Sequence, residues 1–243
     1  MDNKSESNFE QKSMIKLLSF ADTISITNAI FGILSIIFLF SNLIDSQDLR
    51  FRISFSFILI AIVADGLDGI VARKIGKSEI GEYLEAMADT TSLVIAPAIF
   101  IYFIYSDVTS CCIYKNIYLF FALILFLSFG IIRLASFHIL KNDKFFVGFP
   151  APAGTILLLI FSYLKIDFIF ILPAVIIIGA VMVSNIKFPK PGLKINSVAV
   201  LLIIFTIIID KNYYGIAPIL LFIAVSGYTI GGAIYIKFLV KNK

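Results

Sequence analysis

The chain is poor in residues that build many soluble catalytic and metal sites: its 243 residues include no tryptophan, one histidine and two cysteines. Cys111 and Cys112 are adjacent in an expected loop, which argues against a disulfide framework or a cysteine-rich metal site. Charged residues make up only 15% of the sequence, and the net charge of +4 does not require a nucleic-acid partner. The first 13 residues lack an apolar core followed by small residues, so we expect no cleaved signal peptide.

Long apolar runs dominate the sequence. Hydrophobic residues form 60% of the chain and the mean hydropathy is +1.00, values typical of an all-α integral membrane protein. About eight transmembrane helices are predicted, at Asp22–Ile44, Phe51–Arg73, Gly81–Ser106, Asn116–Leu140, Phe149–Leu164, Asp167–Ser184, Ile195–Ile209 and Tyr213–Leu239. The fifth and seventh are short for a bilayer, which needs about 20 residues, so they are tilted, partly interfacial or shielded by neighbours.

We expect one membrane domain over residues 22–239, between an N-terminal tail (1–21) and a C-terminal tail (240–243). The N-terminal tail includes a short amphipathic interfacial helix at Met14–Phe20. Thirteen lysines fall in one set of connecting segments, and only five Lys or Arg residues fall in the alternate set. This bias predicts that both termini and the link Lys74–Ile80 face the cytosol, in a multi-pass protein of the cytoplasmic membrane whose basic residues also meet anionic lipids.

Four carboxylates flank that link. Asp65 and Asp68 are three residues apart, and Glu85 and Asp89 are four apart, so each pair lies on one face of its own helix. If the two helices pack antiparallel, all four side chains point at one small volume. Carboxylates at the edge of hydrocarbon are costly and usually functional. Divalent cations with a preference for oxygen ligands, such as Mg²⁺ or Mn²⁺, would relieve their repulsion.

The neighbours of these acids suit a pyrophosphate. Small residues let a backbone approach a ligand closely, and here they are Gly66, Gly69, Ala72 and Gly81. Arg73 can bind phosphate through its planar guanidinium group, and one carboxylate could take a proton from an attacking hydroxyl. The structural alternative is a buried ion-pair network of the acids with Arg73 and Lys74, although such networks are weak stabilisers.

A long motif resembles the signature of the CDP-alcohol phosphotransferase (phosphatidyltransferase) family, D-x2-D-G-x2-A-R followed by G-x3-D-x3-D. The chain reads Asp65-x2-Asp68-Gly69-x2-Ala72-Arg73-x7-Gly81-x3-Glu85-x3-Asp89, with Glu85 in place of an aspartate. Other stretches resemble the phosphatidylserine synthase branch: MADTTSLVIAPA (Met87–Ala98), RLASFH (Arg133–His138), FVGFPAPA (Phe146–Ala153) and VMVSNIK (Val181–Lys187). Ser136 and His138 differ from bacterial relatives and leave open the archaeal branch, whose lipid is CDP-archaeol.

The resemblance implies a role for each matched residue. Asp65 and Glu85 would bridge two divalent cations, Asp68 would complete the first metal site, and Asp89 would complete the second and act as the general base. The residues expected to bind the CDP-lipid are Asn28, Gly69, Ala72, Arg73, Ser78 and Gly81. Arg133 is a candidate for binding the serine carboxylate; alternatively it reaches the surface or pairs with an acid. Family members are usually homodimers, so a homodimer is expected.

The implied reaction transfers a phosphatidyl or archaetidyl group from the CDP-lipid to L-serine and releases CMP. The same chemistry with inositol phosphate or glycerol phosphate is an alternative, although those acceptors would want more Arg or Lys near the pocket. A cation-coupled transporter is a second alternative, because carboxylates within membranes also form ion pathways. The clustering of the acids at one face, and the lack of matching broken helices in two halves, disfavour it.

Overall fold

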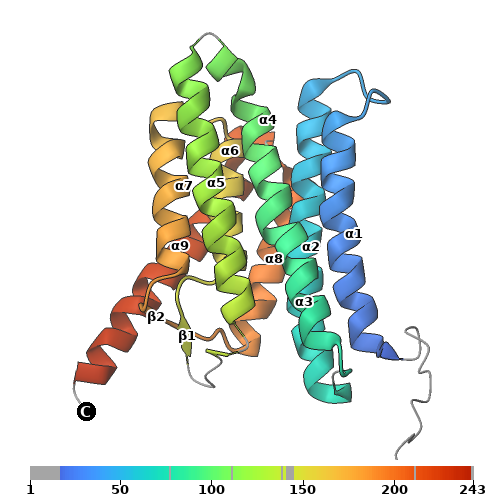
Figure 1. The fold of residues 1–243 in the computed structure, drawn as a ribbon, viewed down its shortest axis with the longest axis vertical. Coiled ribbons are helices and arrows are strands. Elements are labelled where there is room, and N and C mark those ends of the chain that lie inside the picture. Colours follow the sequence, from blue (N-terminus) through green and yellow to red (C-terminus); the bar gives the residue numbers. More distant parts are fainter. Residues whose placement is uncertain are drawn as a thin grey trace, which may run out of the picture.

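The computed structural model describes residues 17–76, 78–110, 112–137, 139–140, 145–210 and 212–241; the side chains at 72–75, 110, 213–214 and 238–241 fall outside this description. The described chain is a bundle of roughly parallel and antiparallel helices (Figure 1). Its helices are α1 (Phe20–Phe40), α2 (Gln47–Ile75), α3 (Gly81–Asp89), the π-helix η2 (Thr90–Ile95), α4 (Ala96–Ser110), α5 (Ile113–Ser136), α6 (Ala151–Tyr163), α7 (Phe168–Met182), α8 (Leu193–Ile209) and α9 (Asn212–Lys241).

The helices confirm the prediction of an all-α membrane protein. Among the described residues, five helical segments are long and apolar enough to cross a bilayer: Phe20–Phe40, Gln47–Val71, Gly81–Thr109, Ile113–Ser136 and Gly215–Lys237. Helices α6, α7 and α8 are apolar but shorter, so the number of eight crossings stays a prediction. The expected amphipathic helix Met14–Phe20 lies partly outside the described residues, and α1 already begins at Phe20.

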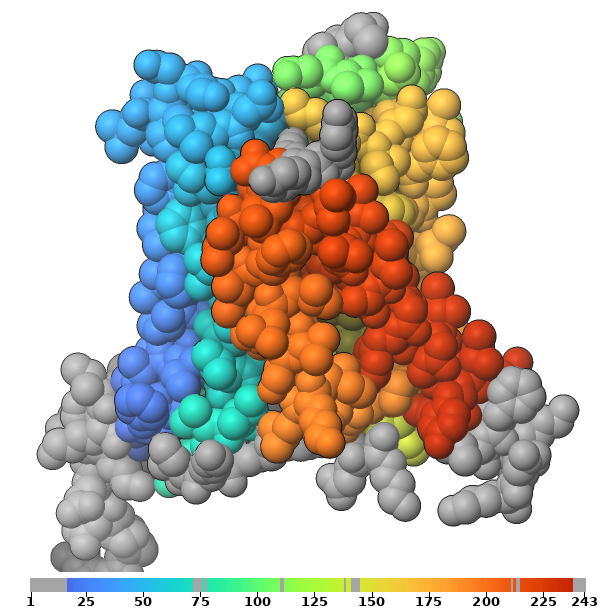
Figure 2. Space-filling model, turned by 180° about the vertical axis from the view of Figure 1, so that it is seen from behind, coloured from blue at the N-terminus to red at the C-terminus, as the bar shows by residue number. Residues whose placement is uncertain are grey.

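The short helices differ in what covers them. Ten of the thirteen residues of α6 are buried, so this helix is shielded by its neighbours, one of the arrangements expected for a short apolar segment. By contrast, α8 lies on the outside of the bundle together with α9, whose C-terminal part diverges from the other helices (Figure 2). The two termini of the described chain lie at the same end of the bundle as the α2–α3 connection (Figure 1).

Local sequence explains where the acid-bearing helices begin and end. Ser19 caps α1, because its hydroxyl accepts from the backbone N–H of Asp22 and the Asp22 carboxylate accepts from that of Ser19. Gly76 follows the last residue of α2 with φ of +92°, a backbone conformation that glycine adopts without strain and that commonly ends helices. The chain therefore turns directly after α2 and re-enters the bundle as α3.

The π-helix η2 directly follows Asp89 and was not predicted from the sequence. It packs against α1 at Gly32, where an added Cβ would lie 2.8 Å from the Cα of Ser92. On another side, the Thr155 hydroxyl of α6 donates a 2.6 Å hydrogen bond to the backbone carbonyl of Leu93. Widened turns of this kind occur frequently at functional sites. Here η2 is fixed by a close helix crossing and by an external donor.

A small β-ribbon was also not predicted. Strands β1 (Phe145–Val147) and β2 (Lys187–Pro189) pair antiparallel, with Phe146 opposite Phe188. The ribbon joins the α5–α6 and α7–α8 connections at the end of the bundle where α2 meets α3 (Figure 1).

Candidate active site

The four acidic side chains come together between the C-terminal half of α2 and helix α3. The Asp89 carboxyl group is hydrogen-bonded to Asp65 and lies close enough to Glu85 and Asp68 to interact with them electrostatically. Asp68 and Asp89 are buried, at 3% and 8% exposure, whereas Asp65 and Glu85 are half-buried. The helix spacing thus gives the convergence expected from the sequence. The cluster opens toward the more exposed pair.

Helix α1 holds the two buried acids from the side. Ser25 donates a hydrogen bond from its hydroxyl to Oδ2 of Asp68, and Asn28 donates from Nδ2 to Oδ1 of Asp89 over 2.9 Å. Both donors are buried, at 2% and 1% exposure, so water does not compete with these contacts. Ser25 was missed by the sequence reasoning. Its signal was available, because Ser25 and Asn28 lie three residues apart and therefore on one face of an apolar helix.

Two buried polar atoms, one beside Asp89 and one in the link before α3, have no hydrogen-bond partner among the described residues. They are Oδ1 of Asn28, whose amide nitrogen is engaged by Asp89, and Oγ of Ser78 in the link before α3. Buried polar groups are almost always satisfied, so unpaired ones are typical of places where a ligand or water binds. Gly81 is buried at the start of α3, and its backbone N–H donates to the Ser78 carbonyl. These three expected ligand-binding residues therefore lie beside the acidic cluster or at the entry to α3.

The remaining expected ligand-binding residues lie along the last turns of α2. Gly69 follows Asp68 directly and is half-buried. Ala72 and Arg73 belong to the same helix, one turn further on, and their side chains fall outside the described set. The α2 backbone thus brings all three positions to the end of the helix that carries Asp65 and Asp68.

The donor set fits a hard divalent cation, although the side chains are not arranged as a ready-made site. Among the described residues no group of three or more His, Cys, Asp or Glu side chains has metal-binding geometry. Yet Asp65 and Asp89 lie next to each other, and Glu85 and Asp68 add further oxygen atoms that could serve as ligands. Oxygen-only ligand sets of this kind suit Mg²⁺ and Mn²⁺.

Arg133 is not brought to the acids. This buried residue of α5 donates from Nε to the Phe149 carbonyl over 3.4 Å, and its guanidinium lies 5.3 Å from the centre of the Phe137 ring. No described contact joins it to the carboxylate cluster. The cavity beside it, which Lys190 also lines, has a volume of about 10 Å³ and holds no more than one water. The role of Arg133 in binding serine stays a prediction.

Comparison with known proteins gives a consistent set of similarities. The sequence profile of a family described as CDP-alcohol phosphatidyltransferase matches residues 18–185. The chain is 37% identical to a CDP-diacylglycerol–serine O-phosphatidyltransferase of Methanocaldococcus jannaschii, over 75% of this chain and 80% of that protein. It is 31% identical to the archaetidylserine synthase of Methanothermobacter thermautotrophicus, over 74% and 73% of the two chains.

A bacterial protein shows a shorter similarity. The CDP-diacylglycerol–serine O-phosphatidyltransferase of Helicobacter pylori is 32% identical, over 55% of this chain and 59% of its own length. The matched residues of the family profile include α1, α2, α3 and η2, the elements that build the acidic cluster.

Proposed function

The chain belongs to the CDP-alcohol phosphatidyltransferase family, and we propose that it transfers the phosphatidyl or archaetidyl group of a CDP-activated lipid to the hydroxyl of L-serine, releasing CMP. The serine acceptor is supported by relatives whose names state it, both at 30% identity or more and over more than two thirds of each chain. Because one of these relatives is named for a diacylglycerol lipid and the other for an archaetidyl lipid, both lipids belong in the test.

The observation that carries the proposal is the convergence of four carboxylates whose two buried members are fixed by α1. Asp65, Asp68, Glu85 and Asp89 would hold divalent cations, two in number by the family resemblance. When bound, such cations neutralise phosphoryl oxygens and stabilise the charge that develops on the leaving group. The chain itself supplies fixed ligands, because Ser25 and Asn28 hold one oxygen each of Asp68 and Asp89.

The unpaired side-chain oxygens of Asn28 and Ser78 support binding of the nucleotide part of the lipid. Oδ1 of Asn28 and Oγ of Ser78 are buried and have no described partner, so both can contact the CDP group. Gly69 and Gly81 leave room for close approach of the pyrophosphate, and Ala72 and Arg73 continue the same helix face. Arg73 supplies the planar donor set that suits a phosphate oxygen pair.

Asp89 is the proposed general base. It accepts the proton of the serine hydroxyl as that oxygen attacks the phosphorus attached to the lipid. A new phosphorus–oxygen bond to serine forms, the bond to CMP breaks, and the lipid keeps one phosphate. The hydrogen bond from Asn28 orients the Asp89 carboxylate during this transfer, so that the general base meets the acceptor in one fixed position.

Sidedness and assembly complete the proposal. The bias of Lys and Arg predicts that the acidic cluster and both termini face the cytosol, where serine and CDP-lipid are accessible. A homodimer in the cytoplasmic membrane is proposed from the family resemblance. The outward-facing side of α9 offers a broad apolar surface, with Ile216, Ile223 and Ile230 among its exposed residues.

One assay tests the proposal. Purified protein in detergent receives CDP-diacylglycerol or CDP-archaeol with Mg²⁺ or Mn²⁺ and one acceptor, and CMP release is measured. We expect release with L-serine and none with inositol phosphate or glycerol phosphate. Release only with a phosphorylated acceptor would reject serine, and no release with any acceptor would revive the transporter alternative.

A further inference from the structure

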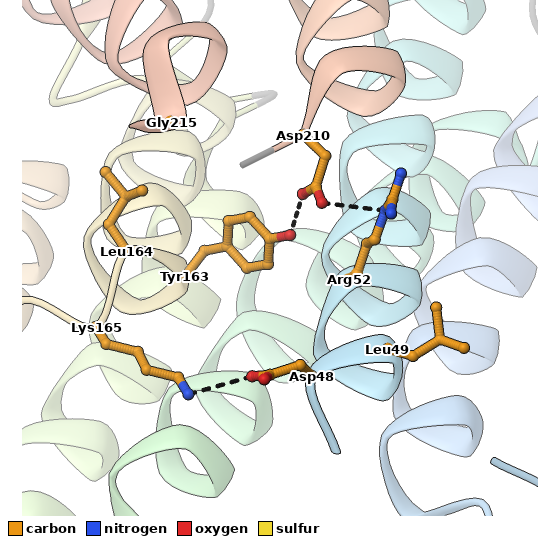
Figure 3. Close-up of a pocket in the computed structure, with 8 residues that line it drawn as sticks. All are labelled: Asp48, Leu49, Arg52, Tyr163, Leu164, Lys165, Asp210 and Gly215. Carbon is orange, nitrogen blue, oxygen red and sulfur yellow. Dashed lines mark hydrogen bonds and ion pairs between the residues drawn. The ribbon is translucent and has the colours of Figure 1, made fainter. Parts of the chain in front are cut away.

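A second cavity lies at the end of the bundle opposite the acidic cluster. It has a volume of about 600 Å³, and its lining residues are Asp48, Leu49, Arg52, Tyr163, Leu164, Lys165, Asp210 and Gly215 (Figure 3). Arg52 precedes Asp65 on α2 by a stretch that rises roughly 20 Å at 1.5 Å per residue, so the two sites are separate. The volume is in the range of small-ligand pockets.

One side of the cavity is a fixed cation. Nε of Arg52 lies 3.1 Å from Oδ2 of Asp210, and Oδ1 of Asp210 accepts a hydrogen bond from the Tyr163 hydroxyl (Figure 3). The Tyr163 ring is in turn stacked on Phe55 at 4.0 Å. Asp210 is almost buried at 11% exposure, whereas Arg52 is 45% exposed. A guanidinium carries five N–H donors, and the described contacts engage only Nε, so its other donors are available to a ligand.

The other side of the cavity is an exchangeable ion pair. Nζ of Lys165 lies 3.3 Å from Oδ1 of Asp48, and both side chains are well exposed, at 55% and 80%. Exposed ion pairs contribute little to stability, so a ligand with one positive and one negative group can replace this contact at little cost. Among the described lining residues, the cavity therefore offers two cations and two anions, of which one pair is fixed and the other can separate.

The cavity also lies where a membrane span begins. The apolar span of α2 starts at Gln47, so the lining residue Asp48 marks the boundary between apolar helix and polar surface. Leu49 and Leu164 add apolar walls. A soluble zwitterion would interact only with the charged residues of the cavity. A lipid would interact with them too, and its glycerol and first chain carbons would also contact these leucines.

We propose that this cavity binds the headgroup of a zwitterionic phospholipid in the leaflet opposite the acidic cluster. The phosphodiester would accept hydrogen bonds from the outer nitrogens of Arg52 and from Lys165, and the ammonium would meet Asp48. Balanced charge in the cavity favours such a headgroup over a purely anionic one. The site is independent of the transferase reaction.

The lack of tryptophan makes a direct test possible. Leu49→Trp places a single fluorophore at the rim, and the protein is reconstituted in phosphatidylglycerol nanodiscs that contain increasing fractions of brominated phosphatidylethanolamine or brominated phosphatidylglycerol. We expect the phosphatidylethanolamine to quench at a lower mole fraction. Adding Asp48→Asn and Lys165→Gln should weaken this preference about fivefold, the upper range for one exposed ion pair.

A matched control is Lys115→Gln, which removes an exposed lysine at the start of α5, at the same end of the bundle (Figure 1). This control variant should show unchanged quenching. The double variant Asp48→Asn/Lys165→Gln should release CMP at the same rate as the unsubstituted protein. Native mass spectrometry of retained phosphatidylethanolamine, with Leu49 intact, repeats the comparison without the fluorophore. Equal quenching by both lipids, an unchanged preference in the double variant, or displacement of the lipid by inorganic phosphate would overturn the proposal.

Discussion

Asn28 on α1 donates a 2.9 Å hydrogen bond to Asp89 at the end of α3, across 61 residues of sequence. Both side chains are buried, so no water can replace the lost partner if either is removed. This contact makes α1 part of the acidic cluster although it contributes none of the four clustered carboxylates. The role of this arrangement can be tested by substitutions at the acid, on α1, and at the contacts that position η2.

Asp89→Asn should reduce CMP release roughly a hundredfold or more, because the amide cannot take a proton from serine. Binding of the CDP-lipid and the thermal unfolding temperature should change little, since the side chain keeps its shape and can still hydrogen-bond. Activity is measured as CMP release and binding by lipid titration. Asp45→Asn, which alters an exposed loop residue, is the control. Unchanged turnover in Asp89→Asn would rule out its role as the base.

Ser25→Ala should raise the concentration of Mn²⁺ needed for half-maximal binding about ten- to hundredfold, the usual effect of removing a group that orients a metal ligand. The reason is that Asp68 loses the donor that fixes its Oδ2. Binding is followed by electron paramagnetic resonance of free Mn²⁺, independently of turnover. Ser35→Ala is the control, because the buried Ser35 hydroxyl bonds only to the Gly32 carbonyl of its own helix. Equal Mn²⁺ affinity in both variants would contradict the assignment.

Thr155→Val should lower the free energy of unfolding by about 1–3 kcal/mol, because the Leu93 carbonyl of the π-helix would stay buried without its donor. The change keeps the side-chain shape, so packing is preserved. Thermal unfolding in detergent measures it. Ser162→Ala removes another buried hydroxyl of α6 that only donates back to Leu158, and it should cost less. The hypothesis fails if the two variants are equally stable.

Gly32→Ala should reduce both stability and CMP release, because the new methyl group would meet the backbone of Ser92 at 2.8 Å and push α1 away from η2. Such a shift displaces Ser25 and Asn28, which share that helix, from the buried acids. Gly227→Ala on α9 is the matched control, since nothing lies within 4 Å of a Cβ added there. A variant at Gly32 that keeps full turnover would show that the α1–η2 crossing does not set the site geometry.

The part of the site that follows from helical periodicity could be predicted from the sequence. Spacing alone puts each pair of acids, Asp65 with Asp68 and Glu85 with Asp89, on one face of its helix. Because the link between the two helices is short, the two pairs are expected to lie close together. The eight apolar segments likewise match the observed helices in position. Helix positions and the residues that share a helix face depend on local chain geometry, so they can be predicted from the order of residues alone.

What the sequence did not reveal depends on packing between distant elements. The hydrogen bond of Ser25 to Asp68 spans 43 residues, and the bond of Thr155 to Leu93 spans 62, so neither leaves a local pattern. The π-helix has no characteristic composition that separates TTSLVI from an α-helical run. Arg133 shows the opposite case: a conspicuous charge in an apolar stretch, which the structure engages with Phe149 and Phe137 instead of the acids.

The π-helix η2 joins α3 to α4 in one continuous helical segment, so it sets the rotation of the acidic face of α3 relative to the buried face of α4. Each residue of an α-helix advances the direction of the side chains by about 100°, and a π-turn holds an additional residue without breaking the rod. Deleting one residue from Thr90–Ile95 would let the segment close into regular α-helix and keep Glu85 and Asp89 near their direction relative to the buried face of α4, because the wide turn holds the extra residue. A one-residue deletion within these six residues would therefore be better tolerated than one in the regular α-helix on either side, which would turn Glu85 and Asp89 by about 100°.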